Sequence, residues 1–159
     1  MNRPTPNPRA PPAVQDAAPE KLGRHGAVIA AVCGTHALLF HAARERRLGC
    51  LAAEAFARCE AREALMYVPA AVIWEIPLLA RRGRTDLGLP LASFCDDLFS
   101  NPVFQSFDLG VEQVLVAIEY PPNADPFDDL VVDAARLLGL PLVTRDRDIV
   151  APALVPTVW

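Results

Sequence analysis

One stretch near the carboxyl end, residues 125–149 with the sequence DPFDDLVVDAARLLGLPLVTRDRDI, constrains the fold more than any other part of the chain. Asp125 is the expected N-cap of a helix, and Pro126 fixes φ at its first position. Apolar residues then recur every three or four positions and give the helix one apolar face, at Phe127, Leu130, Val131, Ala134 and Leu138. Gly139 supplies a left-handed stop, and residues 141–144 form a short, largely apolar strand. The stretch therefore predicts a helix followed by a buried strand.

Carboxylates stand at both ends of this helix–strand unit. Asp128 lies in the first turn of the helix, and Asp146 follows the strand. In open α/β sheets the ligand lies outside the carboxyl ends of the strands. We therefore expect Asp146 to belong to a site and Asp128 to be its partner there.

Length and composition limit the architecture. With 159 residues, 52% of them hydrophobic and 21% charged, the chain is the size of one domain that has its own core and needs no disulfides. The apolar run 27–33 is too short to cross a bilayer, and the run 68–80 is interrupted by Glu75 and Pro77, so no membrane span is predicted. The amino terminus lacks the hydrophobic segment of a secretory signal, which makes the reducing cytoplasm the expected location.

Charge and cysteine content exclude several kinds of site. The net charge of −4 argues against a broad electrostatic surface for nucleic acid, although a metal-loaded carboxylate site can bind phosphate locally. Lys21 is the only lysine and lies in a segment predicted to be disordered, so no mechanism that needs a lysine in the folded core applies. Zinc-ligand spacing is missing, so we expect the four cysteines to be small buried hydrophobes. They are Cys33, Cys50, Cys59 and Cys95.

Helices and strands are predicted to alternate along the chain. Residues 1–24 are rich in proline and are expected to form a disordered tail, followed by one domain at 25–159. Besides the unit above, strands are expected at 27–33, 67–68, 104–107 and 155–159. Helices are expected at 34–47, with its basic residues in the last turn, and at 51–66, 69–82, 91–99 and 111–119. This order predicts an α/β fold, a three-layer α/β/α sandwich with a central parallel sheet.

Five short segments carry a further signal. They are Gly34-Thr35-His36-Ala37-Leu38-Leu39-Phe40, then Val72-Ile73-Trp74-Glu75-Ile76 followed by Gly83, then Asp125-Pro126-Phe127-Asp128, then Leu142-Val143-Thr144-Arg145-Asp146, and last Thr157-Val158-Trp159. Together they resemble the PIN-domain ribonucleases, and in particular the VapC toxins of bacterial toxin–antitoxin pairs. One such segment is weak evidence, but five in the family's order and spacing are specific.

The resemblance implies a PIN-like fold and a quartet of acids that bind Mg²⁺ or Mn²⁺ and cleave RNA endonucleolytically. Glu75, Asp128 and Asp146 match the second, third and fourth acids, and they are expected to converge within reach of one cation at the carboxyl edge of the sheet. The first acid is missing, because Gly34 holds its place. The resemblance also implies that the hydroxyl of Thr35 lines the site.

Three further residues are expected to support this site: Asp125, Arg145 and Asp148. In an active enzyme the missing carboxylate is replaced by water, by Asp125 or by Asp148, whereas the alternative role of Asp125 is helix capping alone. The chain departs from the family at two other positions. Asp129 stands where an arginine is usual, and Ala124 where a histidine is often found.

Three functions stay open. In the first, the chain is a metal-dependent endoribonuclease that cleaves single-stranded RNA with reduced activity. In the second, it is a catalytically degenerate PIN domain that binds an antitoxin or RNA. The third, for which no motif speaks, is an unrelated α/β metal hydrolase or ligand-binding domain. The first two imply an RNA substrate, a cognate antitoxin and, as in relatives, a homodimer.

Six arginines have two possible roles. They either form solvated faces or hold the RNA backbone or an antitoxin peptide. They are Arg44, Arg46, Arg47, Arg81, Arg82 and Arg84.

Overall fold

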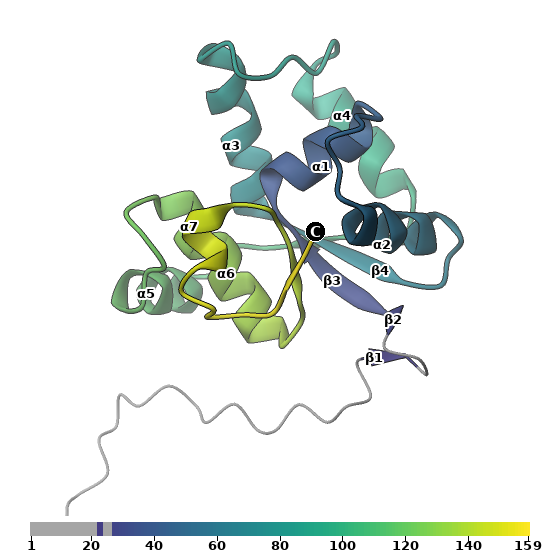
Figure 1. Ribbon diagram of the computed structural model, residues 1–159. Coiled ribbons are helices and arrows are strands. Elements are labelled where there is room, and N and C mark those ends of the chain that lie inside the picture. The colour runs from purple at the N-terminus through teal and green to yellow at the C-terminus, as the bar shows by residue number, and fades with distance from the viewer. Residues whose placement is uncertain (1–21, 24–26) are drawn as a thin grey trace, which may run out of the picture.

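A parallel five-stranded sheet forms the centre of the protein in a computed structural model, which describes residues 22–23 and 27–159 (Figure 1). Its strand order is β5-β4-β3-β6-β7, and every neighbouring pair is parallel. The strands are β3 (Ala30–Cys33), β4 (Leu65–Pro69), β5 (Phe104–Phe107), β6 (Leu142–Val143) and β7 (Thr157–Val158). Each connection contains at least one helix, which is what returns the chain to the same edge and makes the strands parallel.

Helices cover both faces of the sheet. They are α1 (Thr35–Ala42), α2 (Cys50–Glu60), α3 (Ala70–Arg81), α4 (Leu91–Ser100), α5 (Val111–Glu119), α6 (Pro126–Leu138) and α7 (Arg147–Val150). Helix α6 packs on β3 and β4 with α3 and α5 beside it, while α2 packs on β4 next to α1. Figure 1 shows α5, α6 and α7 on one side of β3 and β4, and α1, α2 and α4 on the other. The predicted α/β/α class is confirmed.

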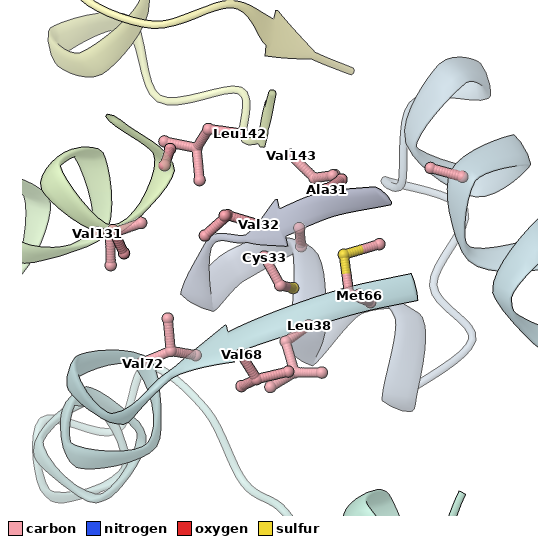
Figure 2. Packing of buried hydrophobic residues seen from close by; sticks show 14 of the residues in the cluster. Ala31, Val32, Cys33, Leu38, Met66, Val68, Val72, Val131, Leu142 and Val143 are labelled. Carbon is pink, nitrogen blue, oxygen red and sulfur yellow. The ribbon is translucent and has the colours of Figure 1, made fainter. Parts of the chain in front are cut away.

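The core has a layer on each side of the sheet. Figure 2 shows Val32 of β3 and Leu142 of β6 pointing toward Val131 of α6, whereas Leu38 of α1 lies with Val68 of β4. All five side chains are buried. Burying each of them stabilises the fold by about 1.5 to 3 kcal/mol relative to leaving it in water.

Helix α6 has the ends that the sequence predicts. The side chain of Asp125 accepts a hydrogen bond from the backbone N–H of Phe127 at 2.9 Å, which caps the first turn. At the other end Gly139 has a φ of +60°, the left-handed conformation that ends a helix. Strand β6 follows within four residues, as expected.

The predicted first strand is two strands. Residues 27–33 divide into β2 (Ala27–Val28) and β3, and Ile29 between them is 37% exposed. Strand β2 pairs antiparallel with β1 (Leu22–Gly23), outside the main sheet. The reason is that β4 begins to pair only at Ala30, so the earlier part of the apolar run has no partner in the central sheet.

Two predicted helices end earlier than expected. Helix α1 stops at Ala42, so Arg44, Arg46 and Arg47 follow the helix and do not lie in its last turn. Helix α2 stops at Glu60, and Met66 lies in β4. In both cases an arginine takes the left-handed conformation, Arg44 with a φ of 52° and Arg62 with a φ of 61°. No glycine marks these helix ends, so the sequence carries no signal that predicts them.

The cysteines are only partly as predicted. Cys33 and Cys59 are buried, but Cys50 is exposed, so the expectation of a small buried hydrophobe is wrong for it. Cys50 opens α2, and the apolar face of that helix passes through Ala52, Ala55, Phe56 and Cys59. Burial raises the pKa of Cys59 to about 11, which keeps its thiol protonated and unreactive. All four cysteines are free.

Helix α5 turns an apolar stripe outward. Val111, Leu115 and Ile118 are 78%, 64% and 70% exposed, while Gln113 and Ala117 face inward and are buried. The side-chain amide of Gln113 donates to the backbone carbonyl of a residue on α6 at 2.9 Å, which ties the two helices together. Among the described residues, no helix is long and apolar enough to cross a membrane.

The predicted tail falls almost wholly outside the described residues. Of residues 1–24, only Leu22 and Gly23 are described, and Lys21 is not. The boundary between a tail and a domain at 25–159 therefore stays a prediction.

Candidate active site

The order of the strands creates a crevice between β3 and β6. From β3 the chain runs to β4 and β5 on one side, and then crosses to β6 and β7 on the other. The carboxyl ends of β3 and β6 therefore flank a topological switch point, the usual place for a ligand in an open parallel sheet. Gly34 follows β3, and its N–H donates to the carbonyl of Val143 in β6 at 3.0 Å.

A cavity of about 140 Å³ opens at this switch point. Six of the candidates for the metal site and its support line it, namely Gly34, Thr35, Glu75, Asp125, Asp128 and Asp146. They come from four separate stretches of the chain, so only the fold brings them together. The two other supporting candidates, Arg145 and Asp148, do not line it.

Glu75 reaches the cavity from α3, on a helix whose neighbouring positions are apolar. The hydroxyl of Thr35, at the start of α1, donates a hydrogen bond to its Oε2 at 2.5 Å. Thr35 itself is buried. The hydroxyl therefore fixes the carboxylate, because a hydrogen bond to a charged acceptor is strong and directional.

Asp128 projects from the first turn of α6 and is held by the preceding turn. The side-chain amide of Asn123 donates to its Oδ2 at 2.8 Å, and the N–H of Asp125 donates to the amide oxygen of Asn123 at 2.6 Å. Burial raises the pKa of Asp128 to about 6, the Asn123 hydrogen bond opposes that rise, and the negative charges of Asp125, Asp146 and Glu75 add to it. The carboxylates of the cavity are thus close enough to repel one another.

Asp146 caps the short helix α7. Its Oδ1 accepts from the N–H of Asp148 at 2.9 Å, and its own N–H donates to the hydroxyl of Thr144 at 3.1 Å. Within the described residues, its second oxygen forms no hydrogen bond. That oxygen is therefore available to the cavity.

The donor set fits a hard divalent cation. Mg²⁺ takes oxygen ligands and is usually held by one or two carboxylates, waters and a substrate phosphate. Glu75, Asp128 and Asp146 offer such oxygens, and their mutual repulsion is what a cation would relieve. In the part of the chain that the structure describes, however, no three His, Cys, Asp or Glu side chains lie close enough together to hold one metal ion jointly. The three acids share a cavity, and their convergence on one cation stays a prediction.

Arg145 and Asp148 lie away from the cavity. The guanidinium of Arg145 sits 4.9 Å from the centre of the Phe40 ring and 5.7 Å from that of Trp159. Asp148 contributes its backbone N–H to the cap of α7, and its side chain is exposed. Asp148 therefore lies near the site without lining it.

Two residues that support the acids were missed in the sequence. Asn123 and Thr144 each stand two positions before an acid and form a turn with its backbone N–H. Short polar side chains often form such local hydrogen bonds two residues onward. That spacing is the signal that could have found both.

Comparison with known proteins gives a match in fold alone. No family model matches the sequence, and a sequence search of curated proteins finds no match. A chain of the VapBC2 complex from Rickettsia felis, crystallised with a DNA fragment from its promoter, has a TM-score of 0.56 and 12% identity, over 80% of this chain and 96% of that one. The chain has the fold of a VapC-like PIN domain. A chain of a toxin–antitoxin complex from Klebsiella pneumoniae also matches, with a TM-score of 0.51 and 17% identity, over 79% and 94%.

The PIN-like fold explains where the cavity lies but does not show which reaction takes place in it. Identities of 12% and 17% are far too low to transfer residues one by one. Function therefore has to be argued from the cavity itself.

Proposed function

We propose that the chain is a metal-dependent endoribonuclease of the VapC toxin type, which cleaves single-stranded RNA. The supporting observation is that Glu75, Asp128 and Asp146, from three separate elements, line one cavity at the switch point of a PIN-like sheet. Acids that repel one another in a cleft are typical of functional sites. The resemblance of the five sequence segments to PIN ribonucleases points to the same chemistry.

Mg²⁺ or Mn²⁺ would take one or two ligands from among Asp128, Asp146 and Glu75, and the others from water and the substrate phosphate. A bound divalent ion activates water and offsets charge on a phosphate under attack. The chain's own supporting groups orient the acids: Thr35 holds Glu75, and Asn123 holds Asp128. Such supporting groups typically change metal affinity or activity by about 10- to 100-fold.

Gly34 supports an alternative, a catalytically degenerate PIN domain that binds RNA or an antitoxin. It lines the cavity and offers no side chain, and by the sequence resemblance it holds the position of the family's first acid. Asp125 lines the same cavity, but its Oδ1 is engaged in capping α6. An active enzyme would therefore rely on water or on the second oxygen of Asp125.

The Gly34→Asp variant separates the two functions. Gly34 has φ −81° and ψ 158°, an extended conformation that any residue adopts. A Cβ there would lie 3.0 Å from the carbonyl oxygen of Val143, so the edge of β6 must yield by a few tenths of an ångström. Gly34→Ala measures the cost of that shift, and relative to Gly34→Ala we expect Gly34→Asp to raise Mg²⁺ or Mn²⁺ affinity and cleavage by about 10- to 100-fold.

Calorimetry with Mg²⁺ or Mn²⁺, and cleavage of single-stranded RNA with and without a chelator, measure both properties. Gly34→Ala is the matched control, since it adds the same Cβ without a carboxylate. Equal, chelator-sensitive cleavage by the wild type and Gly34→Asp would show that another group completes the site. Absence of metal binding and cleavage from both would favour the degenerate binding protein.

The partners follow from the same proposal. Both similar chains belong to toxin–antitoxin complexes, which supports a cognate antitoxin as partner here. RNA as substrate, a homodimer and a cytoplasmic location are part of the proposal. A small neighbouring reading frame with a DNA-binding amino-terminal half would support the antitoxin, and light scattering of the purified chain would measure the dimer.

A further inference from the structure

A second and larger cavity adjoins the carboxylate cavity. Its volume is about 410 Å³, within the range of pockets that hold small molecules or a single nucleotide. His36, Leu79 and Arg84 line both cavities. The two cavities are therefore neighbours across Arg84, just beyond the end of α3.

Aromatic and guanidinium groups form the wall of this second cavity. The guanidinium groups of Arg47 and Arg145 lie over the Phe40 ring, 4.4 Å and 4.9 Å from its centre, and the ring itself is only 5% exposed. Leu87 and Phe94 add apolar surface. Guanidinium planes are surfaces on which nucleic-acid bases stack, and those of Arg47 and Arg145 cover the buried ring.

The acids of the second cavity are partly engaged already. Glu45 is paired with Arg47, and Asp86 accepts from the backbone N–H of Gly88 at 2.8 Å. Asp97 also lines the cavity. Arg84, by contrast, forms no ion pair or side-chain hydrogen bond among the described residues, although it lines a cavity rich in carboxylates. A cation that stays unpaired beside acids is available for an anionic ligand.

We propose that Arg84 binds a backbone phosphate of single-stranded RNA next to the cleaved linkage, and that the second cavity receives the adjoining nucleoside. The inference rests on the proposed function and extends it to the path of the substrate. An arginine binds phosphate through two parallel N–H donors, a geometry that lysine lacks. Arg84 then acts as a positioning residue, because it holds the RNA beside the carboxylates without touching the reacting atoms.

Binding of a fluorescein-labelled RNA decamer, followed by anisotropy over a range of salt concentrations, tests this. It is measured in chelator and again with Mg²⁺, for the wild type, Arg84→Gln and Arg81→Gln. Arg81 is the control, because it is exposed at the same end of α3 and lines neither cavity. We expect Arg84→Gln to weaken binding about tenfold, the loss of one charge-assisted hydrogen bond. The slope of log K against log salt should fall by about 0.7, the value of one phosphate contact in a single strand.

Photo-crosslinking locates the nucleoside independently of any variant. An RNA that carries 4-thiouridine should crosslink to residues 85–94 or to Phe40, identified by mass spectrometry. Crosslinks confined to other surfaces would overturn the placement of the nucleoside.

The outcomes separate this inference from the proposed function. If Arg84→Gln and Arg81→Gln bind RNA equally and with the same salt slope, the role of Arg84 is overturned, and a polypeptide becomes the occupant of the second cavity. If Arg84→Gln alone binds more weakly but no variant cleaves, the inference stands and the nuclease proposal fails. If the wild type binds no RNA in either condition, both fail.

Discussion

Replacing Asp128 with asparagine should stabilise the metal-free protein at neutral pH. Burial raises the pKa of Asp128 to about 6 from an ordinary 3.8, with the charges of Asp125, Asp146 and Glu75 adding to the rise. The folded chain therefore holds the proton more tightly than the unfolded chain does. Above pH 6 the carboxyl is ionised in both states, and the folded state carries the full cost of that charge.

The size of the effect follows from the same values. The interval between 3.8 and about 6 corresponds to at most about 3 kcal/mol. Because Asp128 is only partly buried, solvent screening reduces this to roughly 1 to 2 kcal/mol. The asparagine keeps an oxygen for the 2.8 Å hydrogen bond from Asn123, so that contact is not lost.

Urea unfolding in chelator at pH 7.5 and at pH 4.5 measures the difference. The variant should be more stable by that amount at pH 7.5. As the pH falls through 6 the wild type takes up its proton and gains stability, so the difference should shrink at pH 4.5. Asp108→Asn, a change at an exposed aspartate between β5 and α5, is the control and should show neither effect. A variant that is less stable than the wild type at pH 7.5 would refute burial of the charged carboxyl as the main influence on the pKa of Asp128.

Three further variants test other features. Thr35→Val removes the hydroxyl that donates to Glu75 and should lower the free energy of unfolding by about 1 to 2 kcal/mol, whereas Thr35→Ser, which keeps a donor, should lose less. Burial lowers the pKa of His41 below 6.5, so the wild type should lose stability relative to His41→Phe as the pH falls through 6.5, and a difference independent of pH would contradict this. Gly49→Ala places a Cβ 2.5 Å from the C-terminal tryptophan and should destabilise the fold by about 1 to 3 kcal/mol in thermal melts. Gly110→Ala is the control: it also lies at a helix N-cap, but its Cβ meets open space, so it measures the effect of the cap alone.

Much of the fold could be predicted because its signals are local. Asp125, Pro126 and Gly139 mark both ends of α6, and the structure has the helix where they place it. The ends of α1 and α2 could not be predicted, because Arg44 and Arg62 take a conformation for which glycine is the usual signal.

The candidate site shows the same division. The acids could be named from their segments, but their supporting groups depend on turns and on contacts far apart in sequence. Thr35 and Glu75 are forty residues apart and meet only because α1 and α3 pack together. Asp133 was missed altogether, since a polar residue in an amphipathic helix suggests an outward face, yet it is 1% exposed and its Oδ2 has no hydrogen-bond partner among the described residues.

The strand order has a consequence for how the protein is made. A ribosome releases the chain from the amino end, so β3, β4 and α3 emerge well before α6 and β6. Glu75 and its partner Thr35 can meet early, but Asp128 and Asp146 arrive only with the last third of the chain, and β6 then pairs directly beside the first strand of the sheet. A nascent chain would therefore lack the carboxylate cavity until its synthesis is nearly complete. If the protein is a toxin, this sequence of events would keep each molecule harmless while it is still attached to the translating ribosome.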